Sequence, residues 1–277
     1  TRMFTWQTNA TFAGYLKYRK IMENNGTAVV KPWIEVETER EVVMNGSVNS
    51  EFVMIHRVKI TDLEPGVYEY QCGEPGFWSD VEKFRVKEYD DNSTIKVLWT
   101  TDQQGFTDAE YKAWDACAKT IRSLRGAYDE YGIPNYDLHI NTGDMSENAN
   151  YIWEWLDYFN YCGDLCKRLP HMTTCGNNDL IDQKYGYAFE RYSTYEDQPM
   201  LNDVHGVTAT VDKPMVSTYS FDVGFIHFIC INSNNERMYS DYGVKQKEFL
   251  KKQAYFLDKD MWEVSQRPTK PKWVIVY

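Results

Sequence analysis

The feature that most constrains this fold is a short apolar stretch that ends in a glycine and an aspartate. Residues 138–141 read Leu-His-Ile-Asn, the pattern of a short buried strand, and Gly143 and Asp144 follow shortly after it. Glycine permits a positive φ and therefore a sharp exit from a strand. A carboxylate just beyond the carboxyl end of a parallel strand lies where open α/β sheets gather their ligands. A single copy of this pattern also fits an ordinary turn, because turns are rich in both residues.

The same arrangement occurs twice more, and the repetition favours a sheet edge over an isolated turn. The other copies are residues 95–100, followed by Asp102 and Gln104, and residues 171–174, followed by Asn177 and Asp179. Helix-like segments separate the copies, and strands that alternate with helices indicate βαβ units and a parallel sheet. Loops that follow parallel strands emerge on one edge of the sheet, so we expect Asp102, Asp144 and Asn177 to converge.

Hydrophobic periodicity predicts helices and further strands after residue 94. The predicted helices span residues 107–124, which open with a capping box, residues 151–169 and residues 245–264. A hairpin is predicted from residues 218–223 and 225–231, and a final strand from residues 272–276. Residues 180–216 form a long, Tyr-rich, irregular stretch, and such stretches in compact domains tend to be functional.

Residues 1–88 are predicted to be all-β, because short alternating segments are separated by turn signals. The run Leu63-x-Pro65-Gly66-x-Tyr68-x-Tyr70 resembles the tyrosine corner of fibronectin type III domains. On this resemblance, residues 1–88 form a fibronectin III-like β-sandwich whose first strand is missing. The chain is therefore expected to be multidomain, with a polar linker at residues 87–93 and an α/β domain at residues 94–277.

The composition argues against several classes of partner. The net charge is −11 and no basic patch offsets it, which argues against nucleic acid or an anionic membrane. No apolar run approaches the roughly 18 residues of a membrane span. Asn-x-Ser/Thr sequons are compatible with a secreted or cell-surface protein, and they lie at Asn9, Asn25, Asn45 and Asn92.

The cysteines and histidines show no zinc-finger spacing. Cys162 and Cys166 are one helical turn apart and Cys175 follows nearby, and we interpret them as buried free thiols. Most histidines fall in or beside predicted strands, which indicates structural roles for His56, His139, His171 and His227. His205 lies in the long irregular stretch and is a candidate for substrate contact.

The three strand-end motifs together resemble the calcineurin-like metallophosphoesterases. The motifs that carry the resemblance are Asp102-x-Gln104-Gly105, Gly143-Asp144 and Gly176-Asn177-x-Asp179, in this order. With the preceding fibronectin-like segment, the chain is most similar to the purple-acid-phosphatase-like branch. The resemblance implies β-sheet layers flanked by helices and a centre of two metal ions (Fe, Zn or Mn). It also implies hydrolysis of small phosphate esters by that centre.

The resemblance implies a role for each metal-binding residue. Asp144 would bridge both ions, and Asp102 would bind the first of them. Asn177 would bind the second ion through its neutral amide oxygen. Gln104 stands where the family often has histidine, so it is either a ligand or a hydrogen-bond donor behind the ligands.

The catalytic motif departs from the family pattern. Asn178 and Asp179 stand where the family has a histidine followed by an acid, and we take both as candidates for catalysis. Asn178 can donate a hydrogen bond but cannot act as an acid, so we expect slow chemistry or good leaving groups. Glu147 replaces the tyrosine that gives the purple branch its colour, so no colour is expected. Glu147 joins His205 as a candidate for substrate binding.

The largest departure is an absence. The family's remaining ligands are a histidine directly after a strand like residues 273–277 and a later Gly-His-x-His, and neither occurs here. We therefore expect a fragment of a longer enzyme, cut at both ends. The alternative is a non-catalytic relative that binds a partner through residues 180–216. An unrelated hydrolase or nucleotide-binding protein is disfavoured, because no Gly-x-Ser-x-Gly, P-loop or Gly-x-Gly-x-x-Gly motif occurs.

Overall fold

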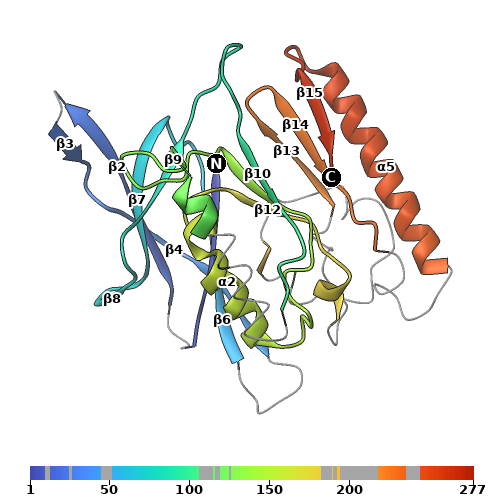
Figure 1. Ribbon diagram of the computed structural model, residues 1–277, viewed down its shortest axis with the longest axis horizontal. Helices are drawn as coiled ribbons and strands as arrows, with labels where there is room; N and C mark the ends of the chain where they lie inside the picture. The colour runs from blue at the N-terminus through green and yellow to red at the C-terminus, as the bar shows by residue number, and fades with distance from the viewer. Residues whose placement is uncertain are drawn as a thin grey trace.

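Short strands dominate the computed structural model, and helices are few (Figure 1). The structure describes residues 1–9, 13–24, 27–44, 52–105, 115, 119–124, 126–181, 189, 192, 193, 218–234 and 244–277. The helices with complete bounds among these residues are α2 (Ile152–Cys166), the short 3₁₀ helix η1 (Asn178–Leu180) and α5 (Val244–Gln266).

The first part of the chain consists of two antiparallel sheets. One has the order β1-β6-β5, and the other has the order β3-β2-β7-β8, with β4 paired to β2 and β9 paired to β7. The bounds are β1 Arg2–Thr8, β2 Tyr15–Asn24, β3 Thr27–Val30, β4 Ile34–Glu37, β5 Glu39–Met44, β6 Phe52–Ile60, β7 Gly66–Glu74, β8 Phe77–Trp78 and β9 Glu82–Val86. Side chains from both sheets share one core, which contains Leu16, Val58, Tyr68 and Phe84. The two sheets therefore face each other across an apolar core.

The turn before β7 has the hydrogen bond that the sequence pattern suggests. The hydroxyl of Tyr68 donates to the backbone carbonyl of Glu64 at 2.9 Å. Its ring stacks on Phe84 with centroids 5.2 Å apart. This contact fixes the Leu-x-Pro-Gly turn against the core, as a tyrosine corner does. The division of the chain into residues 1–88 and 94–277 stays a prediction.

The central sheet is parallel, as the strand-end pattern predicts. It contains β10 (Val97–Thr100), β11 (Leu138–Asn141) and β12 (His171–Thr173) in that order. Both pairings are parallel. The loops after β10, β11 and β12 consequently leave from the same edge of the sheet. The helix expected at residues 151–169 is confirmed as α2, whereas the helix expected at 107–124 lies mostly outside the described residues.

A second sheet packs against the central one. It contains β13 (Tyr219–Val223), β14 (Ile226–Cys230) and β15 (Trp273–Val276), and it confirms the predicted hairpin and final strand. Alternate side chains of a strand point to opposite faces, and here Leu138 and Ile140 of β11 meet Phe228 of β14 in one core. Asn141 faces the other way and bonds to Tyr158 of α2. On the far face of β14, Ile229 packs on Phe256 of α5, so the layers run α2, sheet, sheet, α5.

The helix α5 is bound to β13 and β14 by a charge network around the buried His227. His227, whose side chain is 1% exposed, bonds through Nε2 to Asp260 at 2.8 Å and through Nδ1 to Asp222 at 2.7 Å. Ser220 also donates to Asp260, at 2.6 Å, and Arg267 contacts Asp222 at 3.0 Å. Burial opposes the charged imidazole, but the two carboxylates raise the pKa of His227 from 6.5 to about 9.

This network predicts a pH dependence of stability. The folded chain holds the His227 proton more tightly than the unfolded chain, so its contribution is fully present below pH 6.5 and is lost as the pH rises through about 9. Because Asp222 is partly exposed, we discount the effect to on the order of 2 kcal/mol. Urea unfolding from pH 6 to pH 10 should show this decline, and His227→Asn should flatten it. An equal decline in the variant would contradict the assignment.

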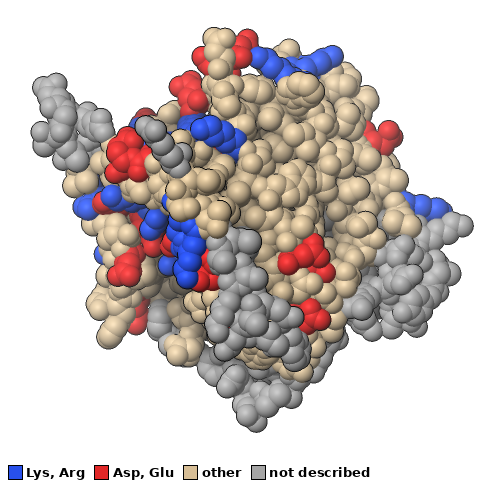
Figure 2. Space-filling view, in the orientation of Figure 1, with Lys and Arg blue, Asp and Glu red and all other residues tan. Residues whose placement is uncertain are grey.

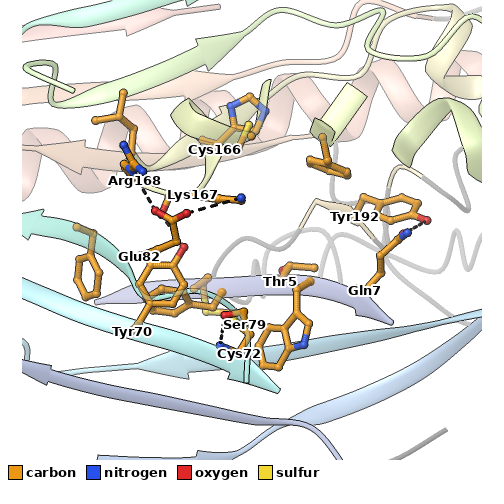
Figure 3. Close-up of a pocket in the computed structure, with 18 of the residues that line it drawn as sticks. Thr5, Gln7, Tyr70, Cys72, Ser79, Glu82, Cys166, Lys167, Arg168 and Tyr192 are labelled. Carbon is orange, nitrogen blue, oxygen red and sulfur yellow. Dashed lines mark hydrogen bonds and ion pairs between the residues drawn. The ribbon is translucent and has the colours of Figure 1, made fainter. Parts of the chain in front are cut away.

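The two parts of the chain are packed together. Ile55 of β6 shares a core with Trp155 and Leu165 of α2. Around this core, Glu82 pairs with Arg168 at 2.9 Å, an ion pair drawn in Figure 3. The predicted linker is also fixed, because Lys87 and Tyr89 both bond to the buried carboxylate of Asp137, at 2.7 and 2.9 Å. Figure 1 shows the N-terminal strands on one side of α2 and the two later sheets on the other.

The charges of the described surface are mixed. On the face seen in Figure 2, Lys and Arg lie among Asp and Glu over the N-terminal strands, and the centre of that face carries few charges of either sign. Within the described part of the chain, no helix combines the length and apolarity needed to cross a bilayer.

Candidate metal centre

The candidate site is built from the loops after β10, β11 and β12. The amide of Asp102 donates to the carbonyl of Gly143 at 3.0 Å, and the amide of Gln104 donates to the carbonyl of Asp144 at 2.9 Å. The third loop joins through Asn178, whose amide donates to Asp144 Oδ1 at 2.9 Å. The three loops therefore meet, with the Asp144 loop in the middle, and the convergence of Asn177 on Asp102 and Asp144 stays a prediction.

Both strand-end aspartates adopt a backbone conformation that L-residues avoid. Asp102 has φ 56° and Asp144 has φ 53°. Of the described non-glycine residues, only Asp62, in the β6–β7 turn, shares a positive φ with them. Such conformations cost free energy and cluster at functional sites, because the surrounding structure must enforce them. Asp and Asn tolerate this region better than most residues do, which fits the residue type found here.

Two glycines allow the second and third loops to touch. A Cβ atom on Gly143, which has φ +104°, would lie 2.4 Å from the backbone nitrogen of Gly176. A Cβ atom on Gly176 would in turn lie 2.1 Å from Asp144 Oδ1. Neither position has room for a side chain. The motif glycines are thus required by a backbone-to-backbone approach as well as by the turn.

The Asp144 carboxylate is held by donors from both neighbouring loops. Besides the amide of Asn178, the Asn178 side chain donates through Nδ2 to Asp144 Oδ2 at 3.2 Å. Gln104 Nε2 lies 3.4 Å from the same oxygen. Asp144 itself is 8% exposed. Its carboxylate is therefore oriented before any ligand arrives, and Asn178 orients it.

Asp179 is enclosed by the loops and does not face the surface. It is fully buried, and Oδ1 accepts from the amides of Met145 and Ser146 at 2.9 and 3.0 Å. Its Oδ2 accepts from the amide of Gly176 at 2.9 Å. Burial raises the pKa of Asp179 to about 6, although these amides work in the opposite direction. The residue expected to act in catalysis therefore has the geometry of a positioning residue that joins the two loops.

Further polar residues hold the loop that carries Asp144, and the sequence pattern did not identify them as part of the site. Asn141 donates through Nδ2 to Gln103 Oε1 at 2.6 Å and accepts from the amide of Gly143 at 2.8 Å. Glu154 accepts from the amides of Glu147 and Asn148, both at 2.7 Å. Burial raises the pKa of Glu154 to about 7. A glutamate in the first turn of a helix was the available signal, since such residues often cap the preceding amides.

The donors at this edge fit a hard cation. Gln104 Oε1 is buried and has no hydrogen-bond partner, although the same side chain lies beside the Asp144 carboxylate. A buried acceptor left unpaired is costly, and an oxygen-binding cation beside Asp144 would satisfy it. Asp102 adds a carboxylate that accepts only from its neighbour Thr101, at 2.5 Å, among the contacts described for it. Carboxylate and amide oxygens together suit Mg²⁺ or Mn²⁺.

The remaining candidates lie at the margins of the site. Asn177 is exposed in the third loop, and its Nδ2 donates to Asn178 Oδ1 at 3.3 Å. Glu147 is half-buried one turn beyond Asp144. His205 and nearly all of the long stretch at 180–216 lie outside the described residues, so their predicted contact with substrate stays a prediction.

Known proteins similar to this chain are phosphatases. Purple acid phosphatase 15 of Arabidopsis thaliana is 24% identical over 249 residues, covering 84% of this chain and 44% of that protein. Acid phosphatase type 7 of Danio rerio is 24% identical over 242 residues, covering 84% and 46%. The purple acid phosphatase PPD1 from yellow lupin (Lupinus luteus) seeds matches 99% of this chain and 48% of its own, with a TM-score of 0.63 and 15% identity. The chain is purple-acid-phosphatase-like.

Two further findings limit how far this likeness to purple acid phosphatases extends. A relative of Arabidopsis thaliana named "Probable inactive purple acid phosphatase 9" is 23% identical and covers 69% of this chain and 32% of that protein. No protein-family model matches the chain. The chain spans about half the length, or less, of the curated relatives it matches.

Proposed function

We propose that this chain carries part of the active site of a metal-dependent phosphohydrolase that cleaves small phosphate esters. The observation that carries the proposal is the convergence of three strand-end loops on an oriented Asp144 with an unpaired buried Gln104 oxygen beside it. The likeness to purple acid phosphatases in sequence and in fold supports the same chemistry. Supporting it independently, both aspartates hold costly positive φ values.

In this proposal the chain's residues have distinct tasks. Asp144 would hold both ions, Asp102 would hold one of them, and Asn177 would hold the other through its amide oxygen. Gln104 Oε1 would be available to the first ion. The ions (Fe, Zn or Mn) would polarise the phosphoryl group and lower the pKa of water toward neutrality.

Asn178 and Glu147 account for the expected differences from purple acid phosphatases. The side chain of Asn178 donates to Asp144 and cannot supply a proton to a leaving group, so activity should favour substrates with good leaving groups. Glu147 gives no phenolate ligand, so no purple colour is expected.

The experiment that tests the proposal is calorimetric titration of the chain with Mn²⁺. Asp144→Asn keeps the shape and the tolerance for positive φ but removes the bridging charge. We expect it to weaken Mn²⁺ binding by more than about 100-fold, the upper end of what loss of a supporting partner costs. Hydrolysis of an aryl phosphate with a good leaving group should fall in parallel.

Asp62→Asn is the matched control, because Asp62 shares the positive φ and is exposed in a turn of the N-terminal part. It should leave Mn²⁺ affinity unchanged. Equal Mn²⁺ affinity in wild type and Asp144→Asn would overturn the metal site and, with it, the proposed chemistry.

The second candidate function is that of a non-catalytic relative that binds a partner through residues 180–216. The observation that favours it is the use of Asn178 to orient Asp144, where the family has an acid-base residue. Phosphate-ester turnover that depends on Asp144 would exclude this function. Mn²⁺ binding with no turnover of any phosphate ester would support it.

We also propose the domain assignment and the location that the resemblance implies. Residues 1–88 are proposed as a fibronectin III-like sandwich and residues 94–277 as a metallophosphoesterase domain, and the Tyr68 corner supports the first of these. Secretion is inferred from the resemblance, and the sequons, of which Asn92 is exposed in a turn, are compatible with it. A mobility shift after glycosidase treatment of the secreted protein would test it.

A further inference from the structure

A cluster of nitrogen and sulfur ligands lies on the face of the central sheet that packs on α2. His139 of β11 and His171 of β12 are paired in register, and their Nδ1 atoms lie 3.0 Å apart. Cys162 and Cys166 extend from α2, with their Sγ atoms 3.0 Å apart. One ligand atom each from His139, Cys162 and Cys166 lie within 4.8 Å of one another.

The outer nitrogens of both rings already have oxygen partners. Nε2 of His139 lies 2.7 Å from Thr100 Oγ1, and Nε2 of His171 lies 2.9 Å from the hydroxyl of Tyr158. The hydroxyl of Tyr158 is in turn fixed by Asn141, which donates to it at 2.9 Å. Histidines that bind metals are oriented in this way, with the outer N–H donated to a fixed acceptor and the inner nitrogen presented to the ion.

We propose that His139, His171, Cys162 and Cys166 form a Cys₂His₂ site for a tetrahedral, thiolate-binding ion of the Zn²⁺ class. Tetrahedral Zn²⁺ with bonds of about 2.3 Å to sulfur and 2.0 Å to nitrogen places two sulfurs about 3.8 Å apart and two nitrogens about 3.3 Å apart. The Sγ and Nδ1 pairs need to open by less than about 1 Å each to reach these separations. The sulfur-to-nitrogen separations among His139, Cys162 and Cys166, which lie within 4.8 Å, must shorten to about 3.5 Å, and His171 must rotate toward the sulfurs to complete the site.

Burial and ligand type favour an ion at this cluster. His139 and Cys162 have no exposed surface. The sulfur atoms of Cys162 and Cys166 lie beside the His139 ring. Two cysteine sulfurs beside two imidazoles are a softer donor set than the oxygens around Asp144, so absorption from sulfur ligands distinguishes this site from the oxygen site.

The cluster also has an entry path. A cavity of about 590 Å³ lies between the N-terminal strands and α2, and both Cys166 and His171 line it. Figure 3 shows Cys166 on one wall of this cavity, across from Tyr70 and Cys72. An ion can therefore reach the cluster from the cavity without unfolding of the sheet or of α2.

This site differs from the proposed phosphohydrolase centre in position and in chemistry. His139 and Asn141 point from β11 toward α2, whereas Asp144 lies in the loop beyond the strand end. The inference does not depend on the proposed function, and each can fail alone. Oxidation of Cys162 and Cys166 to a disulfide would compete with metal binding, because their sulfur atoms lie close together.

Co²⁺ is the probe, because thiolate ligands give tetrahedral Co²⁺ strong visible and charge-transfer absorption. We expect the reduced 277-residue chain to bind one equivalent of Co²⁺ with this spectrum, and Zn²⁺ to displace it. Cys162→Ser and Cys166→Ser should abolish the charge-transfer absorption. Tyr158→Phe, which removes the outer partner of His171 together with an acceptor of Asn141, should weaken Co²⁺ binding about 10- to 100-fold.

The controls separate this site from other thiols and from the oxygen site. Cys72→Ser removes a thiol that lines the same cavity, and it should leave the spectrum unchanged. Asp144→Asn should also leave it unchanged. One equivalent of Zn²⁺ should raise the unfolding temperature of Asp144→Asn as it raises that of the wild-type chain, which separates this site from the oxygen site. The inference is overturned if the reduced wild-type chain gives no thiolate spectrum, or if Cys72→Ser loses it.

Discussion

Replacing Gly143 with alanine is expected to lower the free energy of unfolding by about 4 kcal/mol and to displace the Asp144 loop. Two costs combine at this position. The backbone has φ +104°, which strains any L-residue, and the new Cβ would lie 2.4 Å from the Gly176 nitrogen and 2.6 Å from its Cα. These neighbours are backbone atoms, so neither can rotate away. Urea unfolding and Mn²⁺ titration measure the two effects.

Gly76 provides a matched control for the backbone strain. It has φ +96°, and a Cβ atom there would meet nothing within 4 Å. Gly76→Ala should therefore cost only the strain, about 1–2 kcal/mol, and should leave Mn²⁺ affinity unchanged. Similar losses of stability in the two variants would show that the contact between Gly143 and Gly176 is not limiting.

Replacing Asp179 with alanine is expected to cost a similar amount, about 4 kcal/mol, for a different reason. The change leaves the buried amides of Met145, Ser146 and Gly176 without their acceptor. Each unpaired buried donor costs about 1–3 kcal/mol. Asp179→Asn should cost less, because its remaining oxygen can still accept from Met145 and Ser146. We expect the order of stability to be wild type, Asn, Ala, measured by urea unfolding.

An Asp137 variant is the control that distinguishes a loss of Asp144 positioning from a general loss of stability. Asp137 lies just before β11, at the opposite end from Asp144, and its buried carboxylate accepts from Lys87, Tyr89 and the amide of Lys96. Asp137→Ala should also destabilise the chain but should leave Mn²⁺ affinity unchanged. Asp179→Ala should lower Mn²⁺ affinity because it frees the Asp144 loop. Unchanged Mn²⁺ affinity in a folded Asp179→Ala chain would remove its positioning role.

The architecture could be predicted from local patterns because those patterns determine it. Apolar runs of strand length with helical segments between them require parallel pairing, and β10, β11 and β12 pair in that way. The Leu-x-Pro-Gly-x-Tyr turn could be predicted because its hydrogen bond joins Tyr68 to Glu64, residues close in sequence. Similarly, the helix α2 could be predicted because its apolar side chains recur at helical spacing within one short segment. The signal for each of these features lies within a short stretch of sequence.

The finer features of the site could not be predicted, because they depend on register and on packing between distant segments. The sequence indicates that His139 and His171 lie in or beside strands, but only the register of the parallel pair brings their rings together. Two of the three amides that bond to Asp179, those of Met145 and Ser146, are more than thirty residues away, and no motif encodes these contacts. The supporting role of Asn141 could not be predicted either, because it depends on how α2 packs against β11.

The positive φ values of Asp102 and Asp144 have a practical consequence for anyone who engineers this chain. Glycine is the residue best suited to both positions as far as the backbone is concerned, because it lacks the Cβ that makes this conformation costly. A library screened only for heat resistance would therefore enrich glycine at 102 and would discard that carboxylate, whereas at 144 the donors of Asn178 oppose the change. Thermostabilised versions of this chain need to be selected for ion binding in the same round.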